Sequence, residues 1–114
     1  MRNTKKQGRF TLFVYPERPN YYIGVCAEFD LIQEGKTIPE TMERIKEASI
    51  NYLKTVIKFN MSDDLLNREA PKEHWRKFKL FQKKKVDEEK RKYWEKRLQE
   101  LFYDQKFLKE KLNV

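Results

Sequence analysis

Apolar residues in the N-terminal half of the chain follow the spacing of β-strands. Residues 10–15 (FTLFVY) are an almost unbroken apolar run, and residues 17–20 after it are turn-forming. From residue 21 to 29 every odd position is apolar, which is the period of two that predicts a half-buried strand. The even positions include Gly24, Cys26 and Glu28. Residues 31–34 can add a short third strand, and Gly35 gives the backbone freedom to leave the sheet. The pattern predicts a three-stranded meander.

A helix is predicted to begin after Thr37. The sequence T-x-x-E allows Thr37 and Glu40 to satisfy backbone amides of the first turn, and Pro39 lies where its missing N–H has no cost. A stripe of mainly apolar positions then recurs every three or four residues, so one face of the helix should pack on the sheet. The stripe consists of Ile38, Met42, Ile45, Ser49, Tyr52 and Val56, with Leu53 and Ile57 beside it.

The C-terminal half begins with a predicted linker, residues 59–71, that carries one short helix starting near Ser62. Residues 72–84 then place three aromatic side chains on one helical side, namely Trp75, Phe78 and Phe81. A longer helix is predicted over residues 86–111. Its seam steps by three and four residues like a coiled coil, through Trp94, Leu98, Leu101, Gln105, Leu108 and Leu112.

This seam, with Trp94, Leu98, Leu101, Leu108 and Leu112 as candidate oligomerisation residues, has two interpretations. It either folds back on the N-terminal domain or pairs with a second copy of the chain. A helix of about 26 residues spans roughly 39 Å, which is longer than a small domain needs as cover. The length favours a homodimer or a higher homo-oligomer.

Together these elements predict an α+β fold. A three- to four-stranded antiparallel sheet packs on one helix, and a helical C-terminal extension follows. We divide the chain into a β-β-β-α domain (8–58), a linker (59–71) and a basic helical extension (72–114). A length of 114 residues allows one domain with an appendage rather than two independent domains.

The net charge of +8 is distributed unevenly. Residues 72–114 hold 15 Lys and Arg against eight Asp and Glu, whereas residues 1–71 hold 11 against 10. Candidate phosphate contacts in the basic extension are Lys77, Lys79, Lys83, Lys84, Lys85, Lys90, Arg91, Lys92 and Arg97. The alternative interpretation is an ordinary solvated helix face. Aromatic residues lie among these cations and could stack on bases, but their helical spacing favours packing instead.

The segment from Tyr21 to Leu53 resembles the HicB-like antitoxin family. The resemblance rests on an aromatic-led strand, an acidic bend, a short strand ending in Gly, and a Thr-capped helix with Glu-Ala near its middle. The residues that carry it are Tyr22, Glu28, Asp30, Gly35, Thr37, Glu47, Ala48, Tyr52 and Leu53. With the first strand included, the resemblance covers residues 10–57, which is less than half of the chain.

The resemblance implies a truncated RNase H-like fold without the nuclease centre, acting as antitoxin to a small HicA-type RNase. Members of this family usually carry a C-terminal helix-turn-helix or ribbon-helix-helix segment that binds operator DNA. The C-terminal part of this chain matches neither pattern, and it is basic, whereas a protein that covers an RNA-binding toxin would more naturally be acidic. This departure sets the chain apart from the family pattern.

Candidate catalytic groups are few. Glu28 and Asp30 lie two apart and resemble part of a magnesium site, but such a site needs more ligands than these two. His74 is the only histidine and is expected on the surface without metal or catalytic company. Cys26, the only cysteine, is expected to be a small sheet residue. We therefore predict no enzyme activity, no cofactor and no metal.

The sequence favours a cytoplasmic protein, because a single cysteine forms no intrachain disulfide and no stretch approaches the roughly 20 apolar residues of a membrane span. The predicted function is that of a non-catalytic binding module that sequesters a small protein partner such as a HicA-type toxin. The alternative is a nucleic-acid-binding regulator, with DNA or RNA as the partner of the basic C-terminal helices.

Overall fold

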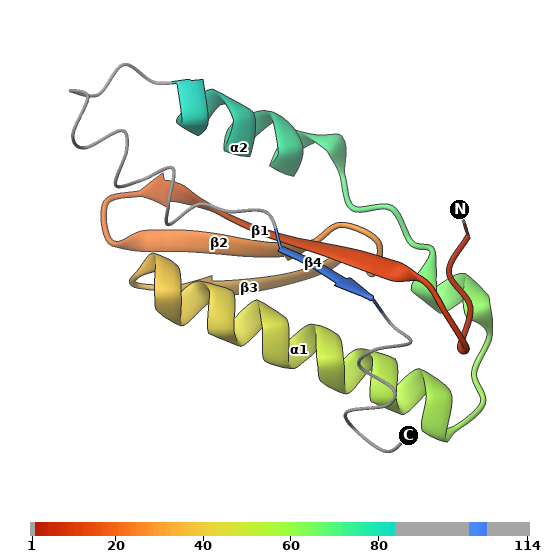
Figure 1. Ribbon diagram of the computed structural model, residues 1–114. Coiled ribbons are helices and arrows are strands. Elements are labelled where there is room, and N and C mark those ends of the chain that lie inside the picture. Colours follow the sequence, from red (N-terminus) through yellow and green to blue (C-terminus); the bar gives the residue numbers. More distant parts are fainter. Residues whose placement is uncertain (1, 84–100, 105–114) are drawn as a thin grey trace.

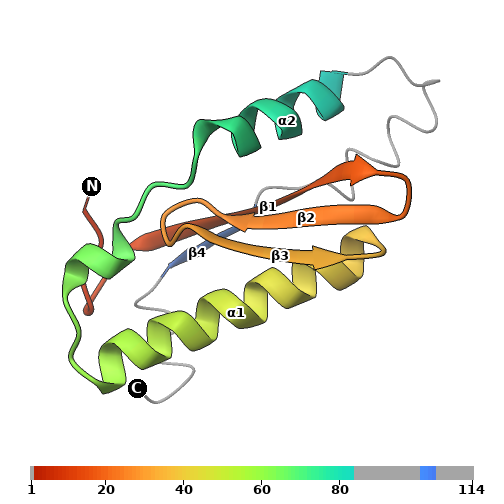
Figure 2. The same cartoon turned by 180° about the vertical axis from the view of Figure 1, so that it is seen from behind.

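The computed structural model describes residues 2–83 and 101–104, which form a four-stranded antiparallel sheet with one helix on each face (Figure 1). The elements in chain order are β1 (Arg9–Arg18), β2 (Tyr21–Cys26), β3 (Leu31–Gly35), α1 (Ile38–Lys58), the 3-10 helix η1 (Asp63–Leu66), α2 (Lys72–Lys83) and β4 (Leu101–Asp104). The strands lie in the order β3-β2-β1-β4. The view from behind shows the same layers, with α1 and α2 on opposite sides of the sheet (Figure 2). The predicted α+β class, with a sheet packed on a helix, is confirmed.

The hairpin of β1 and β2 turns at Pro19 and Asn20. Asn20 has a φ of 58°, in the left-handed region that asparagine tolerates better than most residues. β1 continues beyond Pro16 to Arg18, and its register with β2 shifts between these two residues. Proline has no N–H for the strand ladder, so an irregular pairing is where a strand accommodates it. The first strand is therefore longer than the apolar run indicates.

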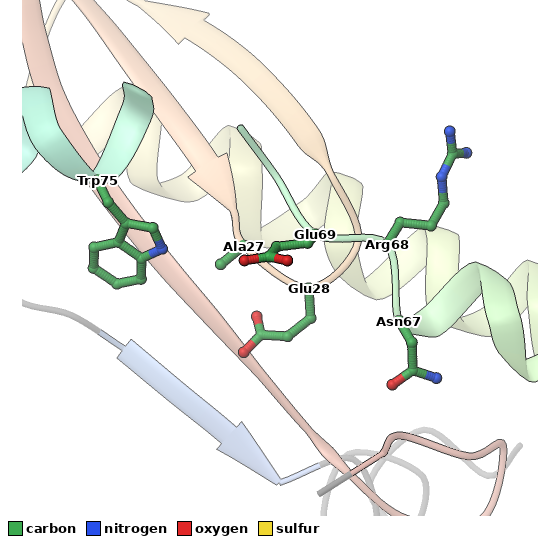
Figure 3. Close-up of a pocket in the computed structure, with 6 residues that line it drawn as sticks. All are labelled: Ala27, Glu28, Asn67, Arg68, Glu69 and Trp75. Atoms are coloured by element: carbon green, nitrogen blue, oxygen red, sulfur yellow. The ribbon is translucent and has the colours of Figure 1, made fainter. Parts of the chain in front are cut away.

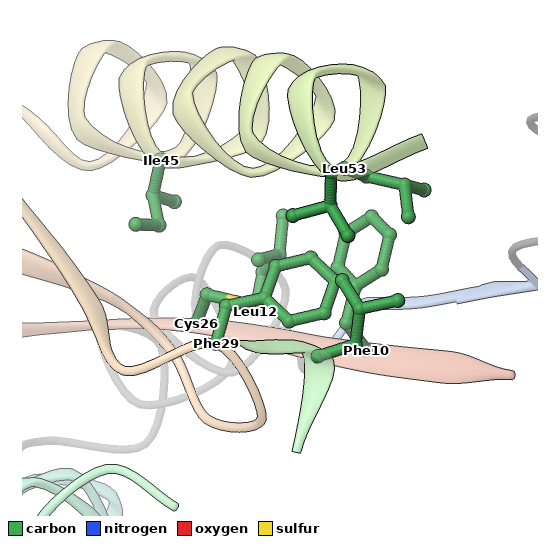
Figure 4. Close-up of a cluster of buried hydrophobic side chains, with 8 residues drawn as sticks. Phe10, Leu12, Cys26, Phe29, Ile45 and Leu53 are labelled. Carbon is green, nitrogen blue, oxygen red and sulfur yellow. The ribbon is translucent and has the colours of Figure 1, made fainter. Parts of the chain in front are cut away.

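β2 is buried on both faces, so the prediction of a half-buried strand is wrong. Val25 pairs with Phe13 and belongs to the cluster on the α2 side. Cys26 belongs to the cluster that α1 covers (Figure 4). On that side a Cβ at Gly24 would lie 3.1 Å from the Ile45 side chain, so the small residue lets α1 approach the sheet closely. On β2, α1 therefore packs against the face that carries the small residues, and α2 packs against the face that carries the larger apolar residues.

Gly35 has a different role from the predicted one. Its backbone is not in the left-handed region, so conformational freedom is not the reason for glycine here. A Cβ at Gly35 would overlap Thr41 Oγ1 and would lie 3.1 Å from both Cα and N of Thr41. The first turn of α1 therefore passes directly over the end of β3, where any side chain would force Thr41 to shift.

α1 begins where the capping pattern predicts. Thr37 is the N-cap, and its Oγ1 accepts a hydrogen bond of 3.2 Å from the backbone N–H of Glu40. The Glu40 side chain in turn accepts from the backbone N–H of Lys36 at 3.0 Å. Thr41 Oγ1 donates to the carbonyl oxygen of Thr37 at 2.6 Å. These bonds satisfy orphan groups at the helix start.

The predicted linker, residues 59–71, is fastened to the rest of the fold. Its short helix is η1, with Ser62 as the N-cap. Leu66 and Ala70 are buried in the core. The Asn3 side chain donates to the carbonyl oxygen of Leu66 at 2.8 Å, and the backbone N–H of Ala70 donates to the carbonyl oxygen of Ala27 at 2.8 Å. This segment thus carries the chain from the α1 side of the sheet to the α2 side.

The prediction of a helix over residues 86–111 is wrong at Leu101–Asp104, because these residues form β4. This strand pairs antiparallel with β1, with Leu101 opposite Leu12 and Asp104 opposite Arg9. The sequence LFYD is rich in residues that favour strands, and β1 offers open backbone groups along its outer edge. Trp94, Leu98, Leu108 and Leu112 lie outside the described residues. The role of the seam in oligomerisation stays a prediction, but it cannot run through Leu101 as one continuous helix.

Candidate functional site

α2 is held on the sheet by its aromatic side chains. The Trp75 ring stacks on Phe13 with a centroid distance of 4.2 Å, and the fully buried Phe78 lies 5.2 Å from the same ring. Phe81 packs against the same cluster. The packing interpretation of these aromatic residues is therefore confirmed, and the sheet fixes which side of α2 faces solvent.

His74 takes part in this contact through a hydrogen bond. Tyr15 Oη lies 2.8 Å from His74 Nδ1. Tyr15 is almost fully buried, and burial raises the pKa of its hydroxyl above the ordinary value. His74 is half-buried rather than freely exposed, and its role here is to meet a buried polar group.

Lys77 is turned toward the sheet and forms ion pairs there. Its Nζ lies 3.1 Å from Glu17 Oε1 and 3.3 Å from Glu73 Oε1. The hydrogen bond to Glu17 is the main reason why the pKa of Lys77 lies above its ordinary value. Of the predicted phosphate contacts, Lys77 is therefore already occupied within the chain.

The outer face of α2 carries a row of exposed cations, which we call the basic stripe. It consists of Lys72, Arg76, Lys79 and Lys83. Spacings of four, three and four residues place them within about 60° of one another around the helix axis. The only acidic residue of α2 is Glu73, which pairs with Lys77 beside the stripe.

The basic stripe contains Lys79 and Lys83 from the predicted set and adds Lys72 and Arg76. Sequence reasoning missed these two because it counted lysine density rather than helical position. The same spacing rule that found the aromatic face would have found them. The predicted contacts Lys84, Lys85, Lys90, Arg91, Lys92 and Arg97 lie outside the described residues.

A surface pocket of about 320 Å³ lies beside Trp75 (Figure 3). It is lined by Ala27, Glu28, Asn67, Arg68, Glu69 and Trp75. Figure 3 shows the Asn67 and Arg68 side chains pointing away from Trp75. The remaining polar side chains of the lining are the carboxylates of Glu28 and Glu69, of which Glu28 has a structural partner.

Glu28 accepts two hydrogen bonds from Thr11. Thr11 N donates to Glu28 Oε1 at 2.7 Å, and Thr11 Oγ1 donates to Glu28 Oε2 at 2.9 Å. The carbonyl oxygen of the neighbouring Ala27 accepts from the backbone N–H of Ala70. Asp30 lies in the turn after β2 with a φ of 53°, not on the same strand face as Glu28. Among the described residues no group of three or more His, Cys, Asp or Glu side chains is arranged to hold a metal ion.

Cys26 lies in the core between the sheet and α1 (Figure 4). Burial raises the pKa of its thiol to about 12, so the thiolate is scarce at neutral pH. Its position under α1 agrees with the prediction of a small sheet residue.

Comparisons of the chain with protein-family models, with curated proteins and with solved structures find no match. No helix within residues 2–83 is long and apolar enough to cross a membrane. Function is therefore inferred from the surface of this fold alone.

Proposed function

We propose that the protein is a nucleic-acid-binding module that contacts phosphate groups through the basic stripe of α2. The observation that carries this proposal is the arrangement of the stripe. Its cations are exposed, share one helical side, and have no carboxylate among them. Cations on one side of a rigid element can approach several phosphates at once, and each contact releases counterions.

The docking of α2 supports this use of the stripe. Trp75 and Phe78 bind the inner side of the helix to β1, so the cations are presented without a cost in backbone ordering. Lys77 keeps the carboxylates of Glu17 and Glu73 engaged beside the stripe. Pairing of these carboxylates limits their repulsion of an approaching polyanion.

The test is a titration of a labelled mixed-sequence 24-mer, as a single strand and as a duplex, followed by fluorescence anisotropy at several salt concentrations. The variant Lys79→Gln, Lys83→Gln removes two cations from the stripe. The control Lys36→Gln, Lys58→Gln removes the same charge from two exposed positions, one just before α1 and one at its last residue. On the form that binds, the stripe variant should make the negative slope of log K against log salt shallower by about 1.4–1.8, and the control should leave it unchanged.

Two results would contradict the proposal. Absence of binding to both forms at about 50 mM salt, where phosphate contacts are strong, would remove nucleic acid as a partner. Equal losses in the stripe variant and its control would mean that net charge, not the stripe, causes the binding. Thermal unfolding of each variant checks that α2 is still docked.

A second proposal is a HicB-like module that sequesters a small protein such as a HicA-type RNase toxin. It is favoured by the segment that carries the resemblance, because residues 21–53 form β2, β3 and the greater part of α1 in the expected order. Capture from native lysate with a tagged full chain tests it. One small basic protein that is retained after nuclease treatment would support it, whereas recovery of nucleic acid alone would reject it.

A further inference from the structure

We infer that the basic stripe recognises double-stranded nucleic acid through its phosphates and discriminates against single strands. This inference rests on the proposed function and adds the class of nucleic acid. It follows from which side chains of α2 are available to a ligand and from the geometry of those that are.

The first argument is that no ring in the described part of α2 is freely exposed, since Phe78 is buried and Trp75 and Phe81 are only partly exposed. Proteins that hold single strands combine a basic groove with aromatic side chains on which the bases stack. Here Trp75 stacks on Phe13, Phe78 is fully buried, and Phe81 packs against the core. The exposed large apolar residue of α2 is Leu80, with 58% of its surface accessible, and it has no π-face.

The remote position of Phe59 strengthens this argument. It is the exposed aromatic ring of the described residues, at the C-cap of α1. Because α1 and α2 cover opposite faces of the sheet, this ring cannot serve a strand that lies along the basic stripe (Figure 2). The freely exposed ring Phe59 and the basic stripe therefore lie on opposite sides of the sheet.

The second argument comes from the shape of the stripe. From Lys72 to Lys83 it runs straight along the helix for about 17 Å on a convex ridge. A duplex presents about one phosphate charge per 1.7 Å of its axis and is already stiff. A single strand has a lower charge density and must be ordered to follow a straight row. Four such contacts give a salt slope of about 3.6 on a duplex and about 2.8 on a single strand.

These slopes predict a measurable preference. At about 100 mM salt, the difference corresponds to roughly sixfold tighter binding of the duplex by the four contacts alone. Loss of two contacts reduces the preference to about two- to threefold. Because phosphates are common to both, duplex DNA and duplex RNA fit the same chemistry, and the measurement identifies which one this surface takes.

The experiment uses the full chain and four labelled 24-mers, namely duplex DNA, duplex RNA and an unstructured pyrimidine strand of each. Affinities at 50, 100 and 200 mM salt are measured for the wild type, Lys79→Gln, Lys83→Gln, and the control Lys36→Gln, Lys58→Gln. We expect at least one duplex to bind about sixfold tighter than its single strand at 100 mM, with the preference reduced only in the stripe variant. The duplex that binds more tightly shows whether DNA or RNA is the ligand of this surface.

Single strands that bind as tightly as duplexes, or more tightly, would overturn the inference and leave the proposed function intact. A duplex preference that is unchanged in the stripe variant would also overturn it, because the preference would then arise elsewhere on the chain. Failure of all four probes to bind at 50 mM salt would instead reject the proposed function itself.

Discussion

Replacing Gly35 by alanine tests how the sheet and α1 are joined. The added Cβ would overlap Thr41 Oγ1 and lie 3.1 Å from Thr41 Cα and N. The hydroxyl can rotate only by giving up its bond to the carbonyl oxygen of Thr37, and the backbone atoms can yield only if the first turn of α1 moves. That turn is held in place by the Thr37 cap. The added methyl group therefore meets the hydroxyl and the backbone of Thr41, neither of which can move without breaking an existing interaction.

Overpacking of this kind costs about 1–3 kcal/mol, and contact with backbone places Gly35→Ala in the upper part of that range. For a domain of this size, 1 kcal/mol corresponds to roughly 4–8 °C in Tm, so a loss of about 10–20 °C is expected. Gly24→Ala is the matched control. Its Cβ would meet only side-chain atoms of Ile45 and Thr41 at 3.1 Å, and its cost should be smaller.

A double-mutant cycle with Thr41→Ala isolates the clash. Thr41→Ala alone loses a buried hydrogen bond and should cost about 1 kcal/mol, whereas in the Gly35→Ala background it removes the overlapping oxygen. The two changes should therefore be less destabilising together than their sum, by about 1 kcal/mol, in urea unfolding followed by circular dichroism. Strict additivity, or a Gly35→Ala protein as stable as wild type, would refute the close approach of α1 to β3.

Three further outcomes follow from buried polar groups. Glu28→Ala leaves the buried N–H of Thr11 without its acceptor and should cost about 1–3 kcal/mol in urea unfolding, while Glu28→Gln keeps an acceptor oxygen and should recover most of the loss. The Cys26 thiol should resist maleimide at pH 8 until urea unfolds the chain. Because its pKa of about 12 when folded exceeds the ordinary 9.0, its ionisation should lower stability as pH rises from about 9 to 12, a loss absent in Cys26→Ala. Tyr15, whose folded pKa is also raised, should ionise after ordinary tyrosines in a titration at 295 nm, and Tyr15→Phe should reduce this late component, to which Tyr21 also contributes, and remove the bond to His74.

Features that depend on neighbouring residues could be predicted from the sequence. The Thr37 cap, the Ser62 cap and the aromatic face of α2 are local patterns, because the atoms that interact lie within one or two helical turns. The same holds for the period of two in β2. These patterns determine the type of each element and, for the helices, the face that it buries, but not what covers that face.

Features that depend on distant residues could not be predicted. The double burial of β2 requires the position of α2, which reaches the sheet through Ala70 and its bond to Ala27. The contact of Glu28 with Thr11 joins residues 17 positions apart, and no local pattern around Glu28 indicates it. β4 is a long-range pairing with β1, and a strand-like LFYD segment inside a heptad pattern gives no local sign of its partner.

The packing of α2 on the sheet both completes the core of the protein and orients its proposed binding surface. Rotation of α2 about its axis by one position, or 100°, would draw Phe78 out of its buried site and separate Lys77 from Glu17. The stacking of Trp75 on Phe13 and the burial of Phe78 oppose that rotation. The contacts that stabilise the fold therefore also determine that Lys72, Arg76, Lys79 and Lys83 face outward, so the orientation of the basic stripe depends on residues that no ligand would touch.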